Sequence, residues 1–495
     1  MPVTEQDFRQ LFDVLRAIDL FGDGPPEPPW GTQPDVQSVQ RAIDGAAEGL
    51  PLLFEDTYVN PLRDHVPHLL ALVEQDPGEG RVILETIVAA VYDHGVEEVA
   101  APLHRFLAVV SNLYRSFLDA ERRIRADFPL AEALPPLAMF QHSGRSGPFT
   151  VPVDGTHDLF GAAVGVVSLP STYRKDPLLW ASLAHETGGH DVLHADTDLL
   201  PELAGGVRNF FGGGPVTSGQ ITGAQLLGLL WSYWIDEAAS DVYGLLNIGP
   251  SFGLNLIVFF AALNARAEGS DQPSLRTATG RDPMDILDPH PIDILRPHLA
   301  IGVVQSLARL SEEARNAYVQ DLNMLAELCA PGVTEVEVVG SLPRRTGGSL
   351  PLNVRLPLAP MQDAARRVGA FIASTRLQAL GGHSIQDLET WDDPDEAAAL
   401  RIADILTRDA SAVAAGDDAQ LLAGATVAAM NSPGDYEAIT RRLGEALDHS
   451  YSTDPYWGTP KPDLLFIPFR EVDQDALLDR YAVGVRLVGR EAEAA

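Results

Sequence analysis

His185-Glu186-Thr187-Gly188-Gly189-His190 is the stretch on which the interpretation of this chain depends, together with a second one farther along, Asp236-Glu237-Ala238-Ala239-Ser240-Asp241. The two stretches offer two histidines and two well-spaced acidic residues to one metal ion. Zinc in a hydrolytic centre commonly takes three ligands of the His and Glu type. It keeps one position for water and works beside a carboxylate that accepts the proton of that water. All of these groups are present.

The spacing of the two histidines predicts a distorted helix. In a regular α-helix, residues four apart return to nearly the same face, but His185 and His190 are five apart and would point in different directions. A local widening of the π-bulge kind would bring them together. Gly188 and Gly189 supply backbone freedom for such a widening. Each costs about 0.5–1 kcal/mol relative to alanine in a helix interior, which favours a functional reason for the pair.

The second stretch is predicted to lie on a helix running from about residue 223 to 246. Glu237 and Asp241 fall on one face of that helix, in otherwise apolar surroundings. A buried carboxylate needs a counter-charge. A divalent metal bound by Glu237 would supply the counter-charge directly. Asp241 could instead accept a hydrogen bond from the N–H group of an imidazole that binds the metal.

Length and composition limit the possible functions. The chain has 495 residues, enough for more than one domain, and carries 69 acidic against 35 basic residues, a formal net charge of −34. Such a balance repels nucleic acids and anionic membranes, so we expect neither as a partner. Cys329 is the only cysteine, which excludes an internal disulfide and is typical of a buried apolar position. The first residues lack the pattern of a signal peptide, and the longest apolar run, residues 254–263, is short for a membrane span, so we expect a cytoplasmic protein.

Hydrophobic spacing predicts a mainly α fold with smaller β elements, an α+β protein of three consecutive regions. Residues 1–140 show helical spacing. Residues 141–330 begin with a cluster of small and helix-breaking residues and contain short strand-like runs at 149–153 and 162–169, followed by the helices of both stretches. Residues 331–495 are predicted to mix helices with strands. The strand candidates there are residues 333–339 and 464–469.

The first stretch resembles the HExxGH signature of the dipeptidyl peptidase III family, and the second is similar to the acidic segment that follows it in that family and in other gluzincins. The resemblance covers residues 185–241 and implies a zincin-like catalytic domain within residues 141–330. It implies zinc bound by His185, His190 and Glu237. Glu186 would then be the general base, and Asp241 would orient a liganding histidine.

A donor that stabilises the oxyanion completes such a site. The order of the sequence around His290 is similar to that of the transition-state histidine in the same family, so His290 is the first candidate for this catalytic role. The other candidates are Arg296, Tyr233 and Tyr243. The strand expected at residues 165–169 could be an edge along which an extended peptide adds, or simply a core strand.

The sequence therefore predicts a zinc metallopeptidase that hydrolyses a peptide or protein substrate. It does not predict an oligomeric state. Three alternatives remain. His190 and His194 form a rival metal pair at α-helical spacing, although no glutamate follows His190 to serve as base. A modulator-of-gyrase type of peptidase would require a cysteine ligand, for which Cys329 is the only candidate. A zinc-stabilised scaffold or effector would use the metal without catalysis.

Overall fold

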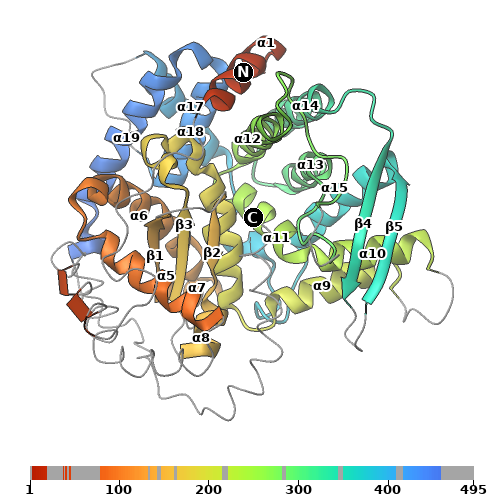
Figure 1. Ribbon diagram of the computed structural model, residues 1–495, viewed down its shortest axis with the longest axis horizontal. Coiled ribbons are helices and arrows are strands. Elements are labelled where there is room, and N and C mark those ends of the chain that lie inside the picture. Colours follow the sequence, from red (N-terminus) through yellow and green to blue (C-terminus); the bar gives the residue numbers. More distant parts are fainter. Residues whose placement is uncertain are drawn as a thin grey trace. The chain divides into compact units, whose positions relative to one another are not determined.

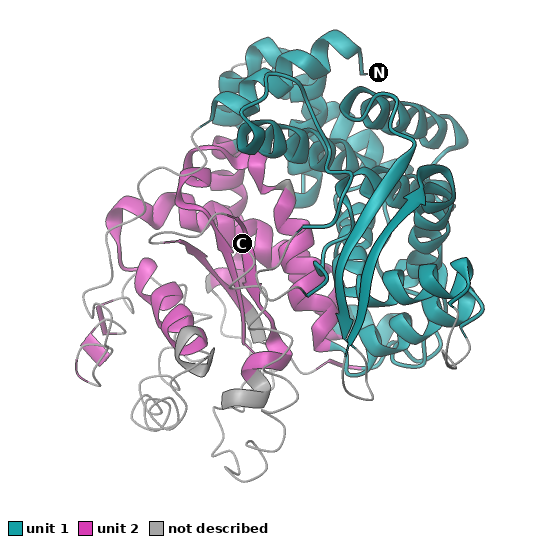
Figure 2. Ribbon diagram, turned by 45° about the vertical axis from the view of Figure 1, so that its right-hand side comes forward, with its two compact units in different colours: residues 1–18, 121–129, 196–443 teal, residues 19–120, 130–195, 444–495 magenta. Residues whose placement is uncertain are grey.

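The computed structural model describes twelve segments of the chain and divides them between two compact units (Figure 2). The described residues are 3–18, 37, 40–41, 44–45, 79–131, 134–141, 147–160, 164–213, 221–280, 286–343, 349–408 and 416–458. Unit 1 comprises residues 1–18, 121–129 and 196–443, and unit 2 comprises residues 19–120, 130–195 and 444–495. The units interleave along the chain, and the division into three consecutive regions stays a prediction.

Unit 2 contains a three-stranded sheet in the order β1-β3-β2 (Figure 1). Strand β1 (Leu134–Phe140) runs parallel to β3 (Val164–Leu169), and β2 (Phe149–Val151) runs antiparallel to it. Every residue of β3 is buried, as its continuous apolar run favours. Both edges of β3 are paired with neighbouring strands, so of the two alternatives for residues 165–169 the core strand is confirmed and the peptide-binding edge is excluded.

Helices of unit 2 cover this sheet and lead into the first stretch. Helices α5 (Glu79–Asp93) and α6 (Glu97–Leu118) pack on β1, and α8 (Val153–Phe160) packs on β3. After β3 the chain forms two 3₁₀ turns, η2 (Ser171–Lys175) and η3 (Pro177–Ala181). It then enters a π-helix, η4 (Ala184–Val192), and ends the segment in a short 3₁₀ turn, η5 (Leu193–Ala195). The π-helix is fully buried and packs against α6, β2 and β3.

The described residues of unit 1 form a helical assembly with one β-hairpin, and the second stretch lies on helix α11 (Ile235–Asn247), which packs against α12, α13 and α15. The single helix expected over residues 223–246 is divided at Trp234 into α10 and α11. The hairpin joins β4 (Glu335–Pro343) to β5 (Ser349–Pro357) in antiparallel register. The other helices of unit 1 are α1 (Glu5–Ala17), α9 (Leu199–Phe210), α10 (Gly223–Tyr233), α12 (Pro250–Glu268), η6 (Asp293–Leu295), α13 (Arg296–Ser306), α14 (Glu312–Cys329), α15 (Leu358–Ser374), α16 (Ile385–Leu388), α17 (Asp393–Arg408), α18 (Asp418–Asn431) and η7 (Pro433–Asp435).

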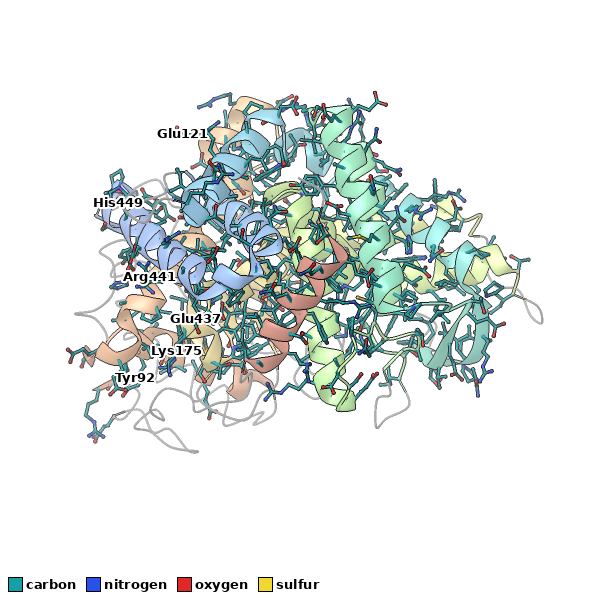
Figure 3. The ribbon with its side chains drawn as sticks, turned by 90° about the horizontal axis from the view of Figure 1, so that it is seen from above. Tyr92, Glu121, Lys175, Glu437, Arg441 and His449 are labelled. Carbon is teal, nitrogen blue, oxygen red and sulfur yellow. The ribbon has the colours of Figure 1, made fainter. Side chains whose placement is uncertain are left out.

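Three terminal or connecting helices complete the described chain: α7 (Ala120–Ala126), α19 (Tyr436–Thr453) and η8 (Pro455–Gly458). Helix α19 is amphipathic. Ile439, Leu443 and Leu447 are buried along one side, whereas Glu437 and His449, labelled in Figure 3, are exposed. This is the periodicity expected of a helix that buries one face.

The mainly helical class with small β elements is confirmed. The strand expected at residues 333–339 corresponds to β4, and the strands expected at 149–153 and 162–169 correspond to β2 and β3. The strand candidate at residues 464–469 lies outside the described residues. None of the described helices is both long and apolar enough to cross a membrane.

Candidate metal centre

The π-helix η4 brings the two motif histidines to one side of the chain. A π turn closes its hydrogen bond between residues five apart, which is the spacing of His185 and His190. Their Nε2 atoms lie 3.2 Å from each other, and their rings meet edge to face. Both side chains are buried, with 8% and 5% of their surface exposed. The widened helix predicted from the five-residue spacing is therefore confirmed.

The separation of the two nitrogens fits a shared metal ion. Two nitrogens at about 2.05 Å from zinc, at the tetrahedral angle, are about 3.3 Å apart. The 3.2 Å between the Nε2 atoms of His185 and His190 agrees with this value. The same distance also permits a hydrogen bond between one protonated and one unprotonated ring. The separation of the pair thus matches that of two ligands of one ion.

Glu186 follows the first histidine and is held by strand β2. The hydroxyl of Thr150 donates to Glu186 Oε2 at 2.9 Å and also lies 3.1 Å from the main-chain oxygen of Glu186. The glutamate side chain is 8% exposed. Thr150 was not singled out in the sequence, because no local pattern joins it to a residue 36 positions away.

Asp191, next to the second histidine, is packed onto strand β3. A Cβ atom at Gly165 would lie 1.8 Å from Asp191 Oδ1, so this side chain fits only because residue 165 is glycine. Asp191 is fully buried. Neither of its carboxylate oxygens has a hydrogen-bond partner among the described residues. Burial raises the pKa of Asp191 well above its usual value. The packing of η4 on β3 thus turns the side chain of Asp191 inward.

Helix α11 carries the acidic half of the candidate site. Glu237 and Asp241 are 3% and 2% exposed, respectively. Both oxygens of Asp241 accept hydrogen bonds from Arg296, at 2.7 Å from Nε and 2.6 Å from Nη2. The guanidinium of Arg296 also lies over the ring of Phe260, 4.5 Å from its centre. Asp241 is thus paired with an arginine, and its predicted role in orienting a liganding histidine stays a prediction.

His290 is held between two carboxylates of unit 1. Its Nε2 lies 3.1 Å from Glu237 Oε1, and its Nδ1 lies 2.8 Å from Asp288 Oδ1. Burial by itself would lower the pKa of His290, but the charge of Glu237 and the hydrogen bond that His290 donates to Asp288 outweigh it and raise the pKa to about 9. Asp288 in turn accepts from Arg276 at 3.2 Å. His290 thus contacts a proposed ligand, whereas its predicted catalytic role stays a prediction.

The remaining candidates have other partners. The hydroxyl of Tyr233 donates to the main-chain oxygen of Leu287 at 2.6 Å, and Tyr243 is completely buried. His194, the rival ligand, has its Nδ1 at 2.9 Å from Asp154 Oδ2, and together with His190 and Asp236 it makes up a second group of side chains that could hold a metal ion. Cys329 is buried in α14, where burial raises the pKa of its thiol to about 12. No candidate metal group among the described residues includes this cysteine.

His185, His190 and Glu237 are all buried and make up a group of side chains that could hold a metal ion. The donor set of two imidazoles and one carboxylate is one that zinc favours, although other divalent transition metals also accept it. No protein-family model, no curated protein and no solved structure matches the chain.

Proposed function

We propose that the protein is a zinc-dependent hydrolase that cleaves peptide bonds, with His185, His190 and Glu237 as ligands of the metal. The observation that carries the proposal is the π turn of η4, which holds the two Nε2 atoms 3.2 Å apart. A buried helix rarely adopts this geometry without a functional reason. The peptide as substrate rests on the resemblance of residues 185–241 to gluzincin peptidases.

Glu186 is the proposed general base. When bound, zinc would acidify water and polarise the substrate carbonyl. Glu186 accepts the proton of the attacking water and passes it to the leaving amine, a role that needs a carboxylate next to the ligand His185. The hydroxyl of Thr150, at 2.9 Å from Oε2, fixes the orientation of this carboxylate and leaves Oε1 for the water.

His290 and Asp288 position the third ligand in this proposal. With its pKa raised to about 9, His290 is protonated at neutral pH and donates from both nitrogens, to Glu237 and to Asp288. Such a clamp fixes the carboxylate of Glu237 before a metal binds, as outer partners of metal ligands commonly do. To stabilise an oxyanion as well, His290 would have to turn its Nε2 away from Glu237 during the reaction.

The test combines metal content with hydrolysis. Zinc is measured by elemental analysis in the wild type and in His190→Ala, Glu186→Gln and His194→Ala, with His449→Ala as a control at an exposed histidine of α19. Hydrolysis of a mixed peptide library is followed by mass spectrometry. We expect about one zinc per chain in the wild type, loss of zinc in His190→Ala only, and about 10²–10⁴-fold slower hydrolysis in Glu186→Gln with zinc retained.

The alternatives give different results. Loss of zinc in His194→Ala would favour the rival pair of His190 and His194. Zinc in the wild type without any peptide cleavage would favour the scaffold. Absence of zinc from the wild type, or full activity of Glu186→Gln, would overturn the proposal.

A further inference from the structure

Unit 1 contains a second candidate site that lies apart from the residues discussed above. A pocket of about 460 Å³ is lined by residues of η6, α13, α14 and α15 and by the segment that leads into β4. This volume lies in the range of pockets that bind small molecules. Its polar lining includes His298, Asn323 and Arg366, and its apolar lining includes Ile294 and Leu358.

Arg366 has no carboxylate partner among the described residues. Its Nη2 donates to His298 Nδ1 at 3.0 Å and to Asn323 Oδ1 at 3.3 Å, while its Nε is buried without a partner. By contrast, Arg296 and Arg276 each form hydrogen bonds to an aspartate. A partly buried guanidinium without a counter-ion lowers the stability of the fold. The chain has 69 acidic residues that could supply a counter-ion, so its absence beside Arg366 among the described residues is notable.

His298 lies beside Arg366 in the lining of the same pocket and carries a second buried donor. Because a guanidinium can only donate, the Nδ1 of His298 must accept, and the proton of the neutral ring then lies on Nε2. Burial and the charge of Arg366 lower the pKa of His298 to about 4, which keeps the ring neutral at pH 7. The side chain is 4% exposed, and Nε2 has no partner among the described residues.

Close packing of two helices fixes these donors in place. A Cβ atom at Gly302 of α13 would lie 1.9 Å from the main-chain oxygen of Arg366, and one at Gly369 of α15 would lie 2.3 Å from that of Leu299. The backbones of α13 and α15 therefore touch, and both glycines are required for this approach. Arg366 and His298 consequently stand on rigid elements, as a built binding site requires.

We propose that this pocket binds a small organic monocarboxylate, with Arg366 and His298 Nε2 donating to its oxygens and Ile294 and Leu358 contacting its apolar body. A carboxylate supplies the missing counter-charge and accepts two or more hydrogen bonds in one plane. Glu327 is the one acidic side chain in the lining and is exposed. It would repel a second negative charge, which favours a monoanion over phosphate. The site does not depend on the metal centre.

The test is calorimetric titration of the full-length chain with hexanoate, with its uncharged analogue hexanamide and with inorganic phosphate. We expect saturable binding of one hexanoate per chain and binding of hexanamide at least tenfold weaker. Arg366→Gln should weaken hexanoate binding at least tenfold. Arg367→Gln should leave it unchanged, since Arg367 pairs with Asp363 and does not line the pocket.

Three results would overturn the proposal: no saturable hexanoate binding by the wild type, equal affinity for hexanoate and hexanamide, or phosphate bound more tightly than hexanoate. Circular dichroism checks that the variants fold. If Arg366→Gln does not fold, Arg366→Lys keeps the charge but loses the planar fork, and a clear fall in hexanoate affinity is again expected. The comparison of hexanoate with hexanamide needs no variant at all.

Discussion

The two regions that carry the candidate ligands are built in opposite ways. The π-helix η4 in unit 2 places His185 and His190 by an unusual backbone, and its neighbour Asp191 packs against a glycine without a counter-charge. Helix α11 in unit 1 is a regular helix, and its acidic residues Glu237 and Asp241 face cationic partners. The first region depends on packing and backbone shape, and the second depends on paired charges.

The largest effect should follow from breaking a charge pair beside α11. Replacing Arg296 by Met leaves the buried carboxylate of Asp241 without its cation, which should lower the free energy of unfolding by about 3–5 kcal/mol. Urea denaturation followed by circular dichroism measures this. Arg408→Met, which removes an exposed pair with Asp404, is the control and should cost less than about 1 kcal/mol. Similar losses in both variants would contradict the dependence on buried charge pairs.

The corresponding change beside η4 is steric. Gly165→Ala places a methyl group against the carboxylate of Asp191, and we expect a loss of about 1–3 kcal/mol in the free energy of unfolding, together with weaker zinc binding. Urea denaturation and competition with a zinc chelator measure the two effects. Gly147→Ala, at a position in unit 2 with open space around it, should change neither. Wild-type stability in Gly165→Ala would show that η4 can shift at little cost.

A pH titration tests the buried neutral histidine on α13. The pKa of His298 is about 4 in the folded chain and about 6.5 when unfolded, so the unfolded chain binds more protons between these values. Above pH 6.5 the ring of His298 is neutral in both states and does not lower the free energy of unfolding. As the pH drops toward 4, protonation of the unfolded chain lowers the free energy of unfolding, by about 2 kcal/mol at pH 5. His298→Gln should flatten this part of the stability profile measured by urea denaturation. An unchanged profile would count against the buried neutral ring.

The smallest effect concerns the single hydroxyl that holds Glu186. Thr150→Val removes the hydrogen bond to Oε2 and should cost about 0.5–1.5 kcal/mol of stability. Under the proposed function it should also slow peptide hydrolysis several-fold. Thr150→Ser keeps the hydroxyl and should resemble the wild type in both measurements. A loss of activity in the serine variant equal to that in the valine variant would show that the methyl group, and not the hydroxyl, matters.

The sequence by itself determined the features that depend on neighbouring residues. The five-residue spacing of His185 and His190 required a π turn, because no regular α-helix aligns residues at that distance. Apolar periodicity gave the mainly helical class and the approximate positions of β2, β3 and β4. These conclusions follow from local backbone geometry, so no knowledge of distant contacts was needed.

Only the tertiary structure decided which distant residues meet. The contact of Thr150 with Glu186, the pairing of Asp241 with Arg296 and the fit of Asp191 against Gly165 each join segments far apart in the chain. The central position of β3 and the pocket beside Arg366 likewise arise from packing. The physical reason is that burial and the pairing of polar groups are optimised over the whole fold, so that the partner of a buried charge cannot be read from its sequence neighbours.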